Sequence, residues 1–195
     1  EEIKNKLIIS PYSDVEYEVE TKKNSLVLTF DSLFRSNRTY ILNFADGIKD
    51  ITEGNKAKRL KYVFSTGSVL DSLVLCGYIK DPLTNELQKE ILVSLYDSND
   101  SLGLFNNKPL YFDYSNDSGF FQIENIKAGF YSLYAFNDKN TTFKAEADRE
   151  AYGFLNKKIA ISKPRDTVYV PIIKQNLLPI RIINSRNRGL YYDVT

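Results

Sequence analysis

The sequence predicts an all-β protein built from Greek-key β-sandwich modules in tandem. Apolar and polar residues alternate in short runs, each bounded by Asn, Asp, Ser, Gly or Pro, a pattern typical of half-buried strands joined by turns. The length of 195 residues accommodates one large or two small domains. Helix formers dominate only one segment, near residues 138–154, where we expect a short helix or an ordered loop.

Five candidate strands fall in the first third of the chain. They are residues 7–9, 17–20, 26–30, 39–44 and 62–65. In the fourth of these, Tyr40, Leu42 and Phe44 face one side and Ile41 faces the other. Apolar residues on both sides predict a sheet with two covered faces.

A small polar junction, Ser65–Thr66–Gly67–Ser68, separates these strands from the next group. We place a domain boundary there, with one module in residues 1–67 and a second in residues 68–175. Seven further strands are expected, which suits a Greek-key sandwich: 72–79, 91–96, 110–114, 120–123, 129–136, 159–161 and 167–173. Asn116–Gly119 predicts a hairpin turn with Gly119 at positive φ.

The two ends of the chain lead us to expect a piece of a longer protein. The sequence holds no methionine, even at position 1, so Glu1 has the character of an interior start. Residues 176–195 contain the alternating run 179–183 and predict the start of a further strand or module that is truncated. A signal peptide or lipid anchor would lie outside the sequence, and no apolar stretch approaches the ~20 residues of a membrane span.

Composition excludes several functional classes. A net charge of +1 gives no electrostatic footprint for nucleic acid or an anionic membrane. The single cysteine, Cys76, cannot form an intramolecular disulfide and is expected to be a small buried hydrophobe. Because there is no histidine, the sequence contains no Ser–His–Asp or Cys–His arrangement and no Cys–His metal cluster.

Carboxylate pairs remain as chemistry that needs no histidine. The pairs Asp113 with Asp117 and Glu146 with Glu150 are interpreted as solvated charges in turns or on the surface. The sequence also lacks a G-x-G-x-x-G loop for phosphate. We therefore predict a protein that is not an enzyme, with no catalytic and no cofactor-binding residues.

One loop carries oxygen ligands of the kind that Ca²⁺ prefers. The candidates are Asp138, Asn140, Asp148 and Glu150. The calcium-loop template requires Gly and a bidentate Glu where this chain has Phe143 and Arg149. We expect an ordinary loop and no bound metal, with Ca²⁺ as the open alternative.

Aromatic side chains offer a second alternative, a surface for stacking sugar rings. The candidates are Tyr111, Phe112, Tyr114, Phe120 and Phe121. On strands with alternating faces most of them must belong to the core, so sandwich packing is the first expectation.

The second module resembles the carboxypeptidase-regulatory-like domain, a prealbumin-like or Cna B-type sandwich. The residues that carry the resemblance are Gly77–Asp81, Ile91–Leu95, Asn116–Ile123 and Ile126–Ala135. They match in order a Gly-x-Val-x-Asp strand, a Val-x-Leu strand, an Asp-x-x-Gly-x-Phe hairpin and an Ala-Gly-x-Tyr-x-Leu strand. The resemblance also implies an intramolecular Lys–Asn isopeptide bond as an open alternative, with Lys80 as an illustrative donor.

The first module is similar to the later part of a bacterial Ig-like domain of Bacteroidetes envelope proteins. The similarity rests on Leu33, Thr39–Phe44, Ile48–Asn55 and Phe64–Gly67, and it implies opening strands upstream of Glu1. Both resemblances imply a structural or interaction module of an extracytoplasmic envelope protein or lipoprotein, in the periplasm, on the outer membrane or at the surface, with a protein partner. The alternative is a carbohydrate-binding or Ca²⁺-dependent ligand-binding module. The oligomeric state stays open.

Overall fold

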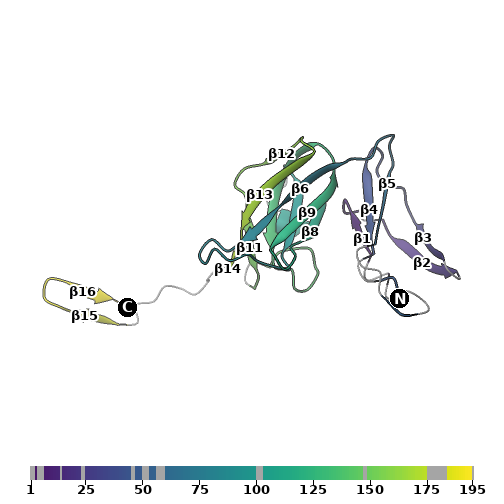
Figure 1. Ribbon diagram of the computed structural model, residues 1–195. Helices are drawn as coiled ribbons and strands as arrows, with labels where there is room; N and C mark the ends of the chain where they lie inside the picture. The colour runs from purple at the N-terminus through teal and green to yellow at the C-terminus, as the bar shows by residue number, and fades with distance from the viewer. Residues whose placement is uncertain are drawn as a thin grey trace.

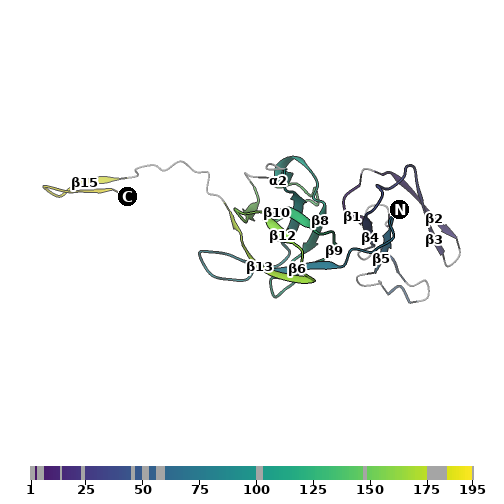
Figure 2. The same ribbon diagram turned by 90° about the horizontal axis from the view of Figure 1, so that it is seen from above.

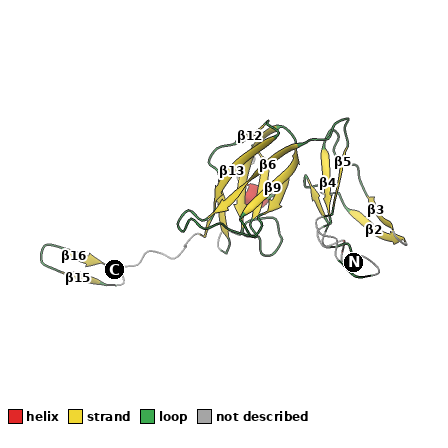
Figure 3. Cartoon of the chain, viewed as in Figure 1, coloured by secondary structure: helices red, strands yellow, loops and turns green. Residues whose placement is uncertain are grey.

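A computed structural model describes residues 3, 7–13, 15–22, 25–44, 47–49, 53–55, 60–99, 103–146, 149–174 and 184–194. Within these ranges the chain forms sixteen strands and one four-residue helix, so the predicted all-β class is confirmed (Figure 3). The described helix is far too short to cross a membrane.

The N-terminal part of the chain forms a three-stranded antiparallel sheet and a separate hairpin. The sheet has the order β1 (Ile8–Ser10), β4 (Thr39–Asn43) and β5 (Lys61–Ser65), and the hairpin joins β2 (Tyr17–Lys22) to β3 (Ser25–Phe30). These strands lie within two residues of the predicted ones. They bury a shared apolar cluster, whose most enclosed members are Ile9, Tyr40, Leu42 and Phe44.

The two faces of β4 are both covered, as predicted. Tyr40 packs in the apolar cluster, with its ring centroid 4.5 Å from that of Phe34. Ile41 is also buried, and it lines a small gap on the opposite face, together with Phe112 and Ile123 of the following sandwich. The second face of the sheet is therefore closed by the neighbouring part of the chain (Figure 1).

The central part of the chain is a sandwich of two sheets (Figures 1 and 2). The larger sheet has the order β14 (Ile173–Lys174), β11 (Ala151–Phe154), β10 (Gly129–Phe136), β7 (Leu92–Asp97) and β8 (Tyr111–Tyr114), with β12 (Ile159–Ile161) also paired to β10. The smaller sheet has the order β13 (Arg165–Pro171), β6 (Leu73–Lys80) and β9 (Phe120–Ile126). The seven predicted strands correspond to β6 to β10, β12 and β13, whereas β11 and the separate two-residue strand β14 were not predicted.

Alternation along each strand builds the core between the sheets. Leu75 and Ile79 on β6, and Leu133 and Ala135 on β10, are fully buried and belong to one cluster. The intervening residues point to the outer faces, because successive side chains of a strand alternate. Cys76 is buried as expected, but on the outer face of β6, where its Sγ accepts a hydrogen bond from Arg165 Nε at 3.2 Å.

The outer face of the larger sheet has its own apolar cover. The helix α2 (Gly103–Asn106) and the loop after β10 lie over Leu92, Tyr96 and Phe136. Ala145 N donates to Leu104 O at 2.8 Å, which ties the loop to the helix. The described residues of the segment 138–150 are thus an ordered loop, the second of the two forms expected there.

The predicted hairpin at Asn116–Gly119 is wrong. Its flanking strands belong to different sheets, because β8 pairs with β7 whereas β9 pairs with β6. The turn itself is as expected, with Gly119 at a φ of +67° and Gly119 N donating to Asn116 O at 2.8 Å. The same turn chemistry serves here to carry the chain across the sandwich.

In the C-terminal tail, β15 (Ser185–Asn187) and β16 (Tyr192–Val194) form a two-stranded antiparallel hairpin. The alternating run 179–183 lies outside the described residues. The truncated further module therefore stays a prediction, as do the boundaries at residues 67 and 175.

A parallel pair links β6 to β13 over seven register positions, from Val74 opposite Arg165 to Lys80 opposite Pro171. The pair depends on a close approach at Gly77. A Cβ atom built on Gly77 would lie 1.9 Å from the carbonyl oxygen of Val168, which no side chain tolerates. The backbone of β13 must therefore pass over a glycine at this point.

Replacing Gly77 by alanine is expected to lower the free energy of unfolding by about 1–3 kcal/mol, because the strands must move apart to admit the methyl group. Urea denaturation measures the change. Gly129→Ala is the matched control, since a Cβ there comes no closer than 3.3 Å to any atom, the nearest being side-chain atoms of Tyr131. Equal losses in the two variants would contradict the close-approach argument.

Candidate functional site

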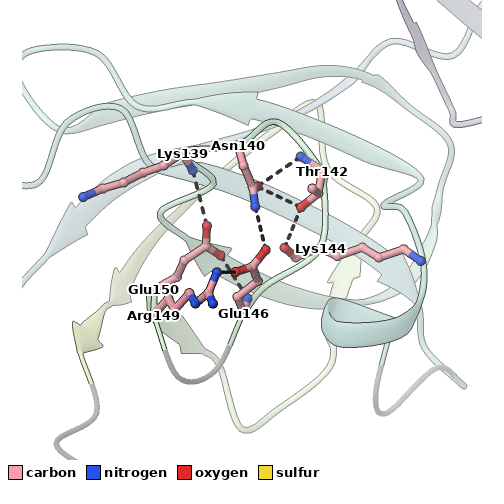
Figure 4. A network of polar contacts seen from close by, with 7 residues as sticks. All are labelled: Lys139, Asn140, Thr142, Lys144, Glu146, Arg149 and Glu150. Carbon is pink, nitrogen blue, oxygen red and sulfur yellow. Dashed lines mark hydrogen bonds and ion pairs between the residues drawn. The ribbon is translucent and has the colours of Figure 1, made fainter.

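The loop after β10 holds the residues predicted as cation ligands, and its polar side chains form a connected network (Figure 4). Asp138, at the base of the loop, is only 6% exposed. Its Oδ1 accepts a hydrogen bond from Thr142 N and its Oδ2 accepts one from Phe143 N, both at 3.0 Å. The two bonds fix a tight turn from the inside.

Glu150 closes the same loop from its other end and is also 6% exposed. Its Oε1 accepts from Lys139 N at 3.3 Å, and its Oε2 accepts from Glu146 N at 3.0 Å. Asn140 Nδ2 donates to Glu146 Oε1 at 2.6 Å across the loop. The interpretation of Glu150 as a solvated charge is therefore wrong, because main-chain amides hold its carboxylate in a buried position.

These bonds stabilise an unfavourable backbone. Thr141 and Phe143 have φ angles of +56° and +60°, which side chains with a Cβ rarely adopt. Hydrogen bonds from main-chain amides to the buried carboxylates offset such strain, since charge-assisted hydrogen bonds are stronger than neutral ones. We interpret Asp138 and Glu150 as residues that define the shape of the loop.

In the described part of this loop, the oxygens that were candidate Ca²⁺ ligands already accept hydrogen bonds. Asp138 and Glu150 direct their oxygens to amides, and Asn140 Oδ1 accepts from Thr142 Oγ1 at 3.0 Å. Asp148, the fourth candidate ligand, lies outside the described residues. Among the residues that are described, no group of three or more Cys, Asp or Glu side chains is gathered for a metal ion. The prediction of no bound metal stays a prediction.

Removing the Asp138 carboxylate is expected to destabilise the protein by roughly 1–3 kcal/mol, because two amides lose their acceptors in a buried setting. Asp138→Asn keeps one acceptor oxygen and should lose less than Asp138→Ala. The free energy of unfolding in urea measures both. Asp117→Ala is the control, since the Asp117 side chain is 91% exposed and a surface change costs about 0.5 kcal/mol or less.

Calcium is expected to leave the melting temperature unchanged, because its binding would have to break the hydrogen bonds that the Asp138 and Glu150 carboxylates accept from main-chain amides. Thermal unfolding with millimolar CaCl₂, compared with the same concentration of MgCl₂ and with EDTA, measures this. A rise specific to Ca²⁺ that Glu150→Gln abolishes would establish the calcium site instead.

A second polar group lies where the N-terminal sheet meets the sandwich. Lys61 of β5 forms an ion pair with Glu124 of β9 at 3.5 Å. Gln122 donates through Nε2 to Glu124 Oε1 at 2.8 Å and accepts through Oε1 from Arg165 at 3.3 Å. A cavity of about 560 Å³ opens beside these side chains, between the two parts of the chain.

Asp113 lines this cavity, and it is half-buried instead of solvated as predicted. Burial raises the pKa of its carboxyl, although the amide of Gln122, which donates to Oδ2 at 3.1 Å, and the Lys61 ammonium oppose the rise. The nearby Glu124 carboxylate adds to it. Its predicted partner Asp117 is exposed and pairs with Lys89, so the two carboxylates do not act together.

The raised pKa makes Asp113 a source of pH dependence. Its stabilising contribution is complete below the pKa of the unfolded chain, about 3.9, and is lost as the pH rises through the folded value. Urea denaturation between about pH 3 and pH 7 should therefore show wild type losing stability relative to Asp113→Asn as the pH rises. A difference that stays constant, or grows in favour of wild type, would contradict the burial effect.

The predicted sugar-stacking aromatics lie in three different places. Tyr111 and Phe121 are buried in the core of the sandwich. Phe112 and Tyr114 pack on the outer face of the larger sheet, where the rings of Phe112 and Phe143 are 5.0 Å apart. Phe120 alone lies on the outer face of the smaller sheet, beside Tyr78, at a ring distance of 5.4 Å.

Sequence reasoning missed Tyr78 and Tyr169, which continue the row begun by Phe120. The signal was present, since both tyrosines stand between core residues on their strands and so must point outward. That the two tyrosines are neighbours could be known only from the parallel pairing of β6 with β13.

Lys80, the illustrative isopeptide donor, is half-buried at the end of β6, in register with Pro171. The isopeptide alternative stays open.

Fold and polar groups together define a class of protein, namely an all-β chain with a β-sandwich at its centre. No family model matches the chain, and no curated protein matches it. Two crystal structures of BcpA, the major pilin subunit of Bacillus cereus, are similar at 14% and 13% identity with a TM-score of 0.36 each. They cover 88% and 86% of this chain, which spans 57% and 56% of the pilin chains. A similarity of this size carries no functional argument.

Proposed function

We propose that this chain is a non-enzymatic, tension-bearing structural module of a bacterial cell-envelope or surface protein. The proposal combines a partial Ig-like module in residues 1–67 with a prealbumin-like sandwich in residues 68–175. The observation that carries it is the parallel pairing of β6, the first strand of the sandwich, with β13, its last long strand.

Parallel strands that carry the two ends of a module load their hydrogen bonds in shear. The chain enters β6 at Leu73, at one end of the pair, and leaves β13 at Pro171, at the other end, before the two-residue strand β14 pairs with β11. Tension along the chain therefore pulls the two strands past each other. All the bonds between them must then break together, whereas an antiparallel hairpin pulled at its open end unzips one bond at a time.

The junction with the N-terminal part is bonded closely enough to transmit such a load. Thr39 N donates to Asp71 Oδ2 at 3.3 Å, and Asp71 N donates to Thr39 Oγ1 at 2.7 Å. On the other side, Ser10 Oγ and Tyr12 N both donate to Leu110 O at 3.1 Å. Hydrogen bonds on both sides of the connection favour a stiff joint.

Residue chemistry supports a non-catalytic role at the cell envelope. The chain has no histidine, and Asp113 and Asp117, one of the two candidate carboxylate pairs, do not act together. In the second pair, Glu146 and Glu150 bond to groups of their own loop. The resemblance of Gly77–Ala135 to prealbumin-like modules supports the extracytoplasmic location and a protein partner.

Single-molecule pulling tests the proposal through the direction of force. We expect a high unfolding force when the protein is held at its two termini, because β6 and β13 are then sheared. The matched control uses the same protein held through cysteines introduced at Asn99 and Phe130, near the end where β7 and β10 meet. Force applied there should unzip the pair and need a much lower load.

Equal unfolding forces in the two directions would overturn the load-bearing role. The wild-type cysteine does not interfere, because Cys76 is buried.

A further inference from the structure

We propose that the outer face of the smaller sheet, formed by β13, β6 and β9, binds a neutral polysaccharide. Sugar rings would stack on the aromatic row formed by Tyr169, Tyr78 and Phe120, and their hydroxyl groups would bond to the polar side chains beside it. This binding site goes beyond the structural role proposed above.

The row is set by strand register. Tyr169 of β13 lies opposite Tyr78 of β6, and Tyr78 lies opposite Phe120 of β9. The Tyr169 and Tyr78 rings are nearly parallel, at 20° and 5.9 Å, and Phe120 meets Tyr78 at 62° and 5.4 Å. Each ring therefore fixes its neighbour, so the row is formed before any ligand arrives.

The row is accessible to a ligand. Tyr169 is 65% exposed, and Tyr78 and Phe120 are half-buried. The residues next to them in sequence fill the core instead, among them Ile79, Phe121 and Val170. Three aromatic residues thus stand on a face where the core needs none.

A polar strip runs beside the row. Thr167 and Gln122 occupy the next outward positions, on either side of the buried Cys76 and about 7 Å from the row along the strands. Arg165 donates to Gln122 at 3.3 Å, and Gln122 donates to Glu124 at 2.8 Å. Amide, guanidinium and carboxylate groups can donate to and accept from neighbouring sugar hydroxyls.

The cavity at the junction continues this site. Phe120 and Tyr114 form aromatic parts of its wall, and the remaining lining is polar: Asn43, Lys61, Asp113, Asn116, Gln122 and Glu124. Its volume of about 560 Å³ suits a small ligand, since such pockets span about 300–1,000 Å³. A sugar unit in the cavity would be continuous with units stacked along the row, because Phe120 belongs to both.

The chemistry of this face favours a neutral sugar polymer. A pyranose ring has an apolar C–H face and a hydroxyl-bearing edge, which match an aromatic row flanked by a polar strip. The charges nearby offset each other, with Lys61 and Arg165 against Asp113 and Glu124. Three rings are also a small apolar area for a stable protein partner, which buries about 800 Å² on each side.

Affinity electrophoresis in gels containing soluble β-glucan, xylan, galactomannan or glycogen tests the proposal. Wild type should be retarded by at least one polymer. Tyr169→Ala should weaken that retardation roughly threefold to tenfold, the loss expected for one aromatic contact. Gln122→Ala, which removes the amide of the polar strip and leaves the aromatic row in place, should weaken the retardation as well.

Phe130→Ala is the matched control, since Phe130 is 66% exposed on β10 of the larger sheet. It should leave retardation unchanged, and circular dichroism verifies that each variant is folded. The proposal is overturned if no polymer retards wild type, or if Tyr169→Ala changes retardation no more than Phe130→Ala. Neither result bears on the unfolding force, so the structural role is tested separately.

Discussion

The parallel pairing of β6 with β13 is the constraint on which the rest of the structure depends. It joins the first and last long strands of the sandwich and so closes the smaller sheet. Its register decides which side chains face inward, such as Leu75 and Val170, and which stand on the outer face. The pairing is possible only because Gly77 has no Cβ where the Val168 carbonyl passes.

Strands could be predicted from the sequence because alternation is a local property, whereas their partners could not. The turn at Asn116–Gly119 has the composition of a hairpin turn, yet it leads from one sheet to the other. The four turn residues do not distinguish a hairpin from a crossing between sheets, since the result depends on which distant strand each flanking strand pairs with. The strand β11 was missed for a related reason, because helix formers precede it and its pairing with β10 outweighs local propensity.

The candidate site shows the same limit for side chains. The carboxylates of Asp138 and Glu150 made Ca²⁺ an open alternative in the sequence, whereas in the folded loop both carboxylates accept hydrogen bonds from main-chain amides. The sequence shows which side-chain oxygens are available, but it does not show which main-chain amides will donate hydrogen bonds to them in the folded loop. The aromatic row was out of reach because Tyr78 and Tyr169 become neighbours only through the parallel pair.

The proposed load-bearing role and the proposed sugar-binding role involve the same two strands. A polysaccharide stacked on both Tyr169 and Tyr78 would bridge β13 and β6, the pair that shear must separate. Sliding of the strands would part the two rings, so a bound sugar should oppose sliding. By the same coupling, a load that shifts the strands should weaken sugar binding. A spacer built in this way would hold its ligand best while unloaded and resist extension best while bound.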